Sequence, residues 1–138
     1  TADGTRDLRV TDQFAIGSIT KTFVAAQVMQ LVEAGELDLN DRVADRLPPD
    51  IHFDTNGARI VDLLSMRSGY PDTLLGPGEW KSFTTDRRHV WTTNEVLATV
   101  GSKRGPVGKK FEYRGINYVL LGLIVEHVTG RPLAELGL

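Results

Sequence analysis

The sequence contains no cysteine. Disulfide bonds, thiol nucleophiles and cysteine-based metal sites are therefore excluded. The three histidines do not have the spacing of metal ligands, either to one another or to carboxylates. The sequence thus offers no candidate ligand set, and we expect neither a metal ion nor another cofactor.

Long hydrophobic runs and a strong net charge are also missing. No apolar segment reaches the roughly 20 residues that span a membrane. The start, TADGTRDLRV, is polar and shows no signal peptide, so we expect a segment from the middle of a larger protein. The formal net charge of −2 gives no reason to expect nucleic acid or an anionic membrane as partner.

Hydrophobic periodicity predicts about five helices and almost no strand. One long helix opens near Ser18 and ends before Gly35, and another is capped by Asn117 and ends at Gly130. Shorter helices are expected within residues 41–47, around 60–64, from Thr92 to Val100, and from Pro132 onward. Phe111 to Tyr113 is expected to be extended, and residues 70–91 to form a long surface loop. The 138 residues could make one small helical domain or the helical part of an α/β protein whose sheet lies elsewhere.

The segment FAIGSITKTF breaks a local rule, because Lys21 follows Ser18 by three residues at the start of a helix. A cation is disfavoured in the first turn, and the usual residue three positions after a capping serine is Glu or Gln. Residues i and i+3 of a helix share a face, so the Lys21 amine can reach the Ser18 hydroxyl. A neutral lysine would serve as the base that a weak serine nucleophile needs, and the Ser18 N–H could stabilise an oxyanion.

By itself a Ser-x-x-Lys pair is weak evidence, since chance produces such pairs in many chains. Its place after Gly17, at the opening of an apolar helix, makes the acylation-site hypothesis stronger. GPVGKK superficially fits a phosphate-binding loop. That motif requires glycine at position 103 and serine or threonine at position 110, but the sequence has Lys103 and Lys110, so this alternative is rejected.

The segment FAIGSITKTFVAAQVMQLVEAGELDLNDRVADRLP resembles the active-site helix of the penicillin-recognising serine hydrolases. It is most similar to the branch with class C β-lactamases and the D-alanyl-D-alanine carboxypeptidases of actinomycetes. ARIVDLLSMRSGY (58–70) and GKKFEYRGINYVLLGLIVEHVTGRPLAEL (108–136) resemble later family segments in the same order. The resemblance covers residues 14–136, and several ordered motifs are far more specific than one pair.

The resemblance implies a mainly α structure, the helical portion of the α/β β-lactamase/DD-peptidase (transpeptidase-like) fold with its central sheet largely missing. Residues 1–138 would form one incomplete domain of that family. An extracytoplasmic location (periplasmic, cell-envelope or secreted) is also implied.

Catalytic roles come with the same resemblance. Ser18 would be the acylated nucleophile, Lys21 its base or proton relay, and Tyr113, the tyrosine of the Tyr-x-Asn motif, would transfer protons to the serine and leaving group. The implied function is a serine acyl hydrolase acting through an acyl-enzyme. Its substrates would be D-Ala-D-Ala peptides of peptidoglycan, β-lactams or small esters.

The family motif is altered here to Tyr113-Arg114-Gly115, so glycine replaces an asparagine that normally binds the substrate amide and the lysine. This favours ester or peptidase substrates over efficient β-lactam hydrolysis. Met66 stands where the family often has a histidine of structural importance. Asn117 matches a helix-cap asparagine of the family and is not a replacement for the missing one.

A local basic patch, formed by Lys103, Arg104, Lys109, Lys110 and Arg114, has two interpretations. It is either a solvated loop or an anchor for a substrate carboxylate, for which Arg114 beside Tyr113 is best placed.

The family's third motif, Lys/His-Thr/Ser-Gly on a sheet strand, has no match in the sequence. Because that strand supplies the second oxyanion donor in the family, we predict no turnover by these residues alone. The alternative hypothesis is a non-catalytic helical fragment or pseudo-enzyme that binds a ligand or partner.

Overall fold

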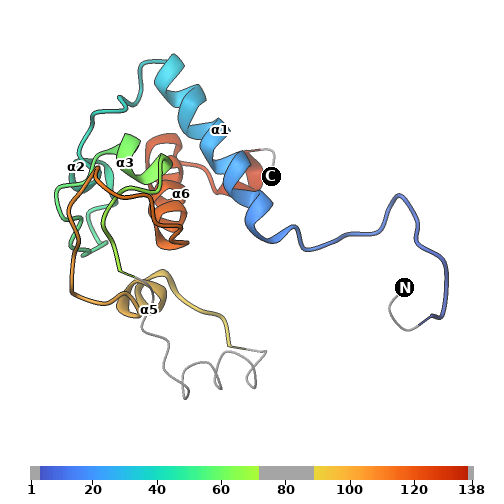
Figure 1. Ribbon diagram of the computed structural model, residues 1–138. Helices are drawn as coiled ribbons and strands as arrows, with labels where there is room; N and C mark the ends of the chain where they lie inside the picture. Colours follow the sequence, from blue (N-terminus) through green and yellow to red (C-terminus); the bar gives the residue numbers. More distant parts are fainter. Residues whose placement is uncertain (1–3, 72–88, 137–138) are drawn as a thin grey trace.

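The computed structural model describes residues 4–71 and 89–136 (Figure 1). Its elements are η1 (Gly17–Ile19), α1 (Thr20–Glu33), α2 (Val43–Arg46), α3 (Ile60–Leu64), α5 (Thr93–Ala98), α6 (Ile116–Thr129) and η2 (Leu133–Glu135). These described ranges hold no strand, and an isolated antiparallel bridge joins Arg42 and Arg59. The mainly helical structure is confirmed. Most of the loop expected at 70–91 lies outside the described residues.

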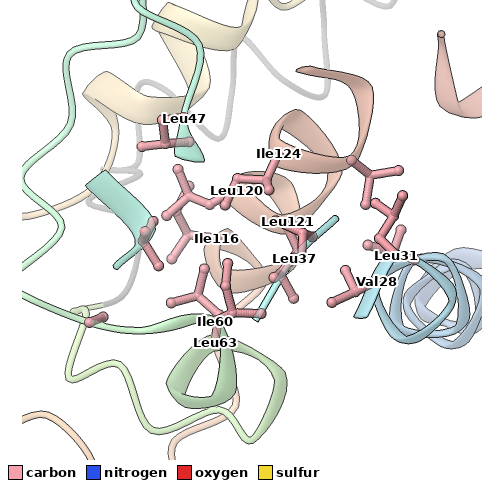
Figure 2. Packing of buried hydrophobic residues seen from close by; sticks show 14 of the residues in the cluster. Val28, Leu31, Leu37, Leu47, Ile60, Leu63, Ile116, Leu120, Leu121 and Ile124 are labelled. Atoms are coloured by element: carbon pink, nitrogen blue, oxygen red, sulfur yellow. The ribbon is translucent and has the colours of Figure 1, made fainter. Parts of the chain in front are cut away.

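The long helices α1 and α6 pack side by side, and α3 contacts α6 from another direction (Figure 1). Each buries the apolar stripe that its sequence predicts, since residues three and four apart share a helix face. Figure 2 shows these side chains gathered around α6. The fully buried members include Val28, Val43, Ile60, Leu63, Leu120, Leu121, Ile124 and Val125.

Most of the predicted helix boundaries are confirmed. Gly35 and Gly130 follow α1 and α6 with φ of 75° and 65°, a left-handed conformation that glycine adopts without strain. Thr92 caps α5, where its hydroxyl accepts from the N–H of Glu95 and the Glu95 carboxylate accepts from the N–H of Thr92.

Two expectations about the C-terminal half are wrong. The cap of α6 is Gly115, and the side chain of Asn117 bonds back to the preceding loop. The segment after Pro132 is only the short 3₁₀ turn η2. Residues 111–113 belong to no helix or strand, and the N–H of Glu112 ties them to the carbonyl of Met66.

The loop before α6 runs along the segment that follows α3. The N–H groups of Gly105, Gly108 and Glu112 donate to carbonyls of Gly69, Arg67 and Met66 at 2.7, 2.8 and 2.9 Å. Gly69 has a φ of 73°, and a Cβ there would lie 2.4 Å from the Gly105 carbonyl oxygen, so only glycine fits. These hydrogen bonds hold the loop as far as Glu112, and the next residue, Tyr113, lies beside Lys21 at the start of α1.

The face of α1 turned away from the core is apolar and exposed. Ile19, Phe23 and Met29 keep 59%, 41% and 48% of their surface accessible. None of the described helices has the length and apolar character needed to cross a membrane. The core therefore covers one side of α1 among the described residues.

Leu120→Ala should lower the free energy of unfolding by about 2–5 kcal/mol, because it leaves a cavity at a fully buried position. Met29→Ala, on the exposed face of α1, should change it by no more than about 0.5 kcal/mol. Urea unfolding followed by circular dichroism measures both values. Equal losses from the two substitutions would contradict this location of the core.

Candidate active site

The first turn of the long N-terminal helix starts from a glycine. Gly17 has a φ of 54°, and a Cβ built there would meet nothing within 4 Å. Glycine is thus required by the backbone conformation rather than by space. The turn places Ser18 in η1 and Lys21 in the first turn of α1. The first N–H groups of a helix have no partner within the helix, so the N–H of Ser18 lies where it can serve an external oxygen.

Lys21 and Ser18 face one another, as the sequence predicts. Their Nζ and Oγ atoms are 3.0 Å apart. A charged amine donates a hydrogen bond to the hydroxyl at this distance, whereas a neutral amine accepts the hydroxyl proton. Ser18 is exposed and Lys21 is only partly buried within the described residues.

Tyr113 joins this pair from a distant part of the sequence. The Lys21 Nζ lies 5.2 Å from the centroid of the Tyr113 ring. The pKa of Tyr113 is lowered, first because the phenolate accepts a hydrogen bond from Ser18 and second because it accepts one from Lys21. Desolvation by burial opposes this lowering of the pKa, and the positive charge of Lys21 favours it by a smaller amount.

The other two tyrosines behave in the opposite way. Burial raises the pKa of Tyr70, and it also raises the pKa of Tyr118. Among the three tyrosines, only Tyr113 has a phenol that is easier to ionise than usual. A group suited to accept and return protons therefore lies beside the serine–lysine pair.

Arg114 does not point freely into the site. Its guanidinium lies 3.6 Å from the Glu112 carboxylate, and it also donates to the Tyr113 carbonyl. Glu112 is paired as well with Lys110 at 2.9 Å. A substrate carboxylate that bound Arg114 would therefore have to compete with the Glu112 carboxylate for its guanidinium.

Gly115 and Lys21 line the same groove between α1 and α6. The groove has a volume of about 320 Å³ and is mostly apolar, with Val24, Val119 and Leu123 among its walls. Gly115 is the N-cap of α6, with φ −57°, and a Cβ there would meet nothing within 4 Å. The site thus has room for a side chain at this position.

The basic patch expected from the sequence is not a single surface. The Arg104 guanidinium lies 5.0 and 5.5 Å from the ring centroids of Phe53 and Tyr70, and its Nε donates to the Asp54 carbonyl. Its side chain is only 11% exposed. Arg104 therefore supports the fold, whereas Lys110 and Arg114 surround Glu112.

The structure thus brings Ser18, Lys21 and Tyr113 together and places Gly115 beside them. It adds Met66, which contacts the segment carrying Tyr113 and which sequence reasoning left outside the site. In residues 4–71 and 89–136, no cluster of three or more His, Asp or Glu side chains could hold a metal ion. The arrangement of a hydroxyl, an amine and an acidified phenol is suited to acyl transfer.

Comparison with known proteins places the chain in a family of known fold. The profile of the Beta-lactamase family matches residues 2–136. "Penicillin-binding protein 4" of Amycolatopsis lactamdurans is 39% identical over 122 residues, covering 86% of this chain and 30% of that protein. "Protein flp" of Staphylococcus aureus (strain NCTC 8325 / PS 47) is 31% identical over 125 residues, covering 86% of this chain and 24% of that protein. The chain thus spans less than a third of the length of these relatives.

Solved structures show the same partial coverage. A D-stereospecific amidohydrolase from Streptomyces sp. superimposes with a TM-score of 0.78 at 30% identity, over 90% of this chain and 39% of that one. The D-amino acid amidase from Ochrobactrum anthropi SV3 superimposes with a TM-score of 0.72 at 29% identity, over 96% and 36%. The helices described above therefore match one part of a larger fold.

Titration of tyrosinate absorbance should show one tyrosine ionising below the ordinary value of about 10, and Tyr113→Phe should remove it. Ser18→Ala should raise that midpoint, because the Ser18 hydrogen bond is the largest cause of the lowered pKa. A pKa lowered by folding contributes its full stabilisation above the unfolded value near 10, and this contribution is lost as the pH falls through the folded pKa. Neutral-pH stability should therefore be unaffected by Tyr113→Phe. A midpoint unchanged in Ser18→Ala would contradict the contact.

Proposed function

Because the chain belongs to the Beta-lactamase family, we propose that it carries the acylation site of a serine acyl hydrolase of the β-lactamase/DD-peptidase type. Ser18 is the nucleophile, Lys21 its base or proton relay, and Tyr113 a second proton-transfer group. The observation that carries the proposal is the 3.0 Å contact between Lys21 Nζ and Ser18 Oγ beside a phenol of lowered pKa.

Acylation begins when Ser18 Oγ attacks the carbonyl carbon of the substrate and its proton passes to a neutral Lys21 or to the Tyr113 phenolate. A bond forms between Oγ and the acyl carbon, and the carbonyl oxygen becomes an oxyanion to which the Ser18 N–H donates. The oxyanion collapses, the bond to the leaving group breaks, and the leaving group takes the proton held by the site. Water then attacks the acyl carbon by the same route and releases Ser18.

The names of two solved relatives point to acyl compounds with a D-configured centre. These two are named as a D-stereospecific amidohydrolase and a D-amino acid amidase, and another relative as a penicillin-binding protein. For this chain the candidates are D-Ala-D-Ala peptides, β-lactams and small esters. Gly115 shifts the preference toward esters, because no side chain at that position is available to bind a substrate amide.

Turnover requires more than the described residues. Ser18 is exposed to solvent, and its N–H is the oxyanion donor proposed above. We expect the remainder of the family domain to supply the second donor and to exclude water. A stable fold that binds ligands without acylation is the competing possibility, and labelling of Ser18 separates the two.

Fluorescent penicillin and a p-nitrophenyl ester should acylate Ser18 in the longest natural polypeptide that contains these residues. Ser18→Ala should abolish the adduct, and Lys21→Met should slow acylation by roughly 10²–10⁴-fold, the usual contribution of a positioned base. The 138 residues alone should show no burst. Peptide mass spectrometry locates the adduct, and the melting temperature of each variant serves as the folding control. No adduct on Ser18 in a folded longer polypeptide would contradict the hydrolase, and a serine-dependent burst from the 138 residues would contradict the need for the rest.

Gly115→Asn should raise the acylation rate with amides and β-lactams by about two- to tenfold relative to Gly115→Ala, while ester acylation changes little. The reason is one additional hydrogen bond to the substrate amide, of about 0.5–1.5 kcal/mol. Both side chains fit, because the Cβ position is open and φ is −57°. The alanine variant controls for the change in backbone freedom. Equal rates in the two variants would show that Gly115 does not set the preference.

A further inference from the structure

Asn117 is a polar residue in the first turn of α6 with no exposed surface. Its side-chain Nδ2 donates to the Arg114 carbonyl at 3.2 Å and lies 3.3 Å from Met66 Sδ. Its backbone N–H donates to the same carbonyl at 3.3 Å. The carbonyl of Arg114, the residue after Tyr113, is therefore held by two donors of one residue.

The cost of burying this amide indicates that stability is not its only purpose. Asn117 Oδ1 is buried and has no hydrogen-bond partner within the described structure. A buried polar atom left unsatisfied costs about 1–3 kcal/mol, which an apolar residue of similar size would avoid. Such an atom calls for an explanation. Here the amide is explained by its other end, because Nδ2 donates to the Arg114 carbonyl.

A second anchor holds the other side of Tyr113. The N–H of Glu112 donates to the Met66 carbonyl at 2.9 Å. Met66 adopts a φ of 57°, a left-handed conformation that costs a non-glycine residue about 1–3 kcal/mol. Both anchors thus meet Met66, one at its carbonyl and one at its sulfur.

We propose that Asn117 is a positioning residue that holds Tyr113 against Ser18 and Lys21 through its hydrogen bonds to the Arg114 carbonyl. The catalytic meaning of this role rests on the function proposed above, whereas the geometric claim does not. Tyr113 is 53% exposed, so little packing fixes its ring. The anchored backbone on either side is what keeps the phenol beside the dyad.

A readout is available that does not depend on turnover. The phenol of Tyr113 faces Ser18 and Lys21 at the start of α1, interacts with Tyr118 of α6, and has Glu112 and Arg114 as chain neighbours. If the loop moves, the phenol loses its hydrogen bonds from Ser18 and Lys21. Its titration midpoint then rises toward the ordinary value near 10.

Asn117→Thr and Asn117→Val form a matched pair, because the two side chains have the same shape and only threonine can donate. A threonine hydroxyl in a helix bonds to the carbonyl three or four residues earlier, and Arg114 is three residues earlier. We expect the tyrosinate midpoint assigned by Tyr113→Phe to stay low in Asn117→Thr and to rise in Asn117→Val. Ile124→Val, which trims a fully buried side chain of α6 and removes no hydrogen bond near Tyr113, should lower thermal stability without moving the midpoint.

Equal midpoints in the folded threonine and valine variants would overturn the proposal. If these two do not fold, Asn117→Ser and Asn117→Ala repeat the comparison with smaller side chains. Loss of the fold in all four would assign Asn117 to the core alone and would also overturn it. Absence of any adduct on Ser18, with a midpoint that still follows the donor at position 117, would leave the positioning role standing and remove the hydrolase.

Discussion

The candidate site depends on one short contact, the hydrogen bond between Lys21 and Ser18 on the opening turn of α1. Because the two residues are separated by three positions, the helix itself supplies their geometry, and α1 must be rigid at its start for the contact to persist. Rigidity comes from the packing of α1 against α6, whose first turn leads directly from Tyr113. The same helix pair therefore forms the core and fixes both halves of the site.

The loop before α6 and the segment after α3 stabilise one another and also hold the residue that precedes Tyr113. Their hydrogen bonds run from the glycine pair Gly69 and Gly105 to Met66 and Glu112, one residue before the tyrosine. Met66 accepts a left-handed backbone at this point, and strain of this kind is usually found where a structure holds a functional group in place. Met66 thus has a clear mechanical use here, because its carbonyl holds the residue that precedes Tyr113.

Local features of the fold and the site could be predicted from the sequence, and distant ones could not. The two long helices were predicted from their apolar stripes and from the glycines that follow them, Gly35 and Gly130. The contact between Ser18 and Lys21 was predicted from their spacing of three residues. The place of Tyr113 followed only from family resemblance, since no local rule joins it to α1. Asn117 was assigned as a cap because its residue type suits one, but a donor contact to Arg114 took precedence. Arg104 was grouped with the local basic patch because the aromatic rings of Phe53 and Tyr70 that cover it are remote in sequence.

The central claim is that the phenol of Tyr113 and the amine of Lys21 share one site on the folded chain. Nuclear Overhauser spectroscopy on the isotope-labelled chain tests it directly. We predict cross-peaks between the Tyr113 ring protons and the Lys21 side-chain protons next to Nζ, since Nζ lies 5.2 Å from the ring centroid. Absence of these cross-peaks, in spectra where the contacts among Leu120, Ile124 and Leu63 are plainly present, would contradict the account.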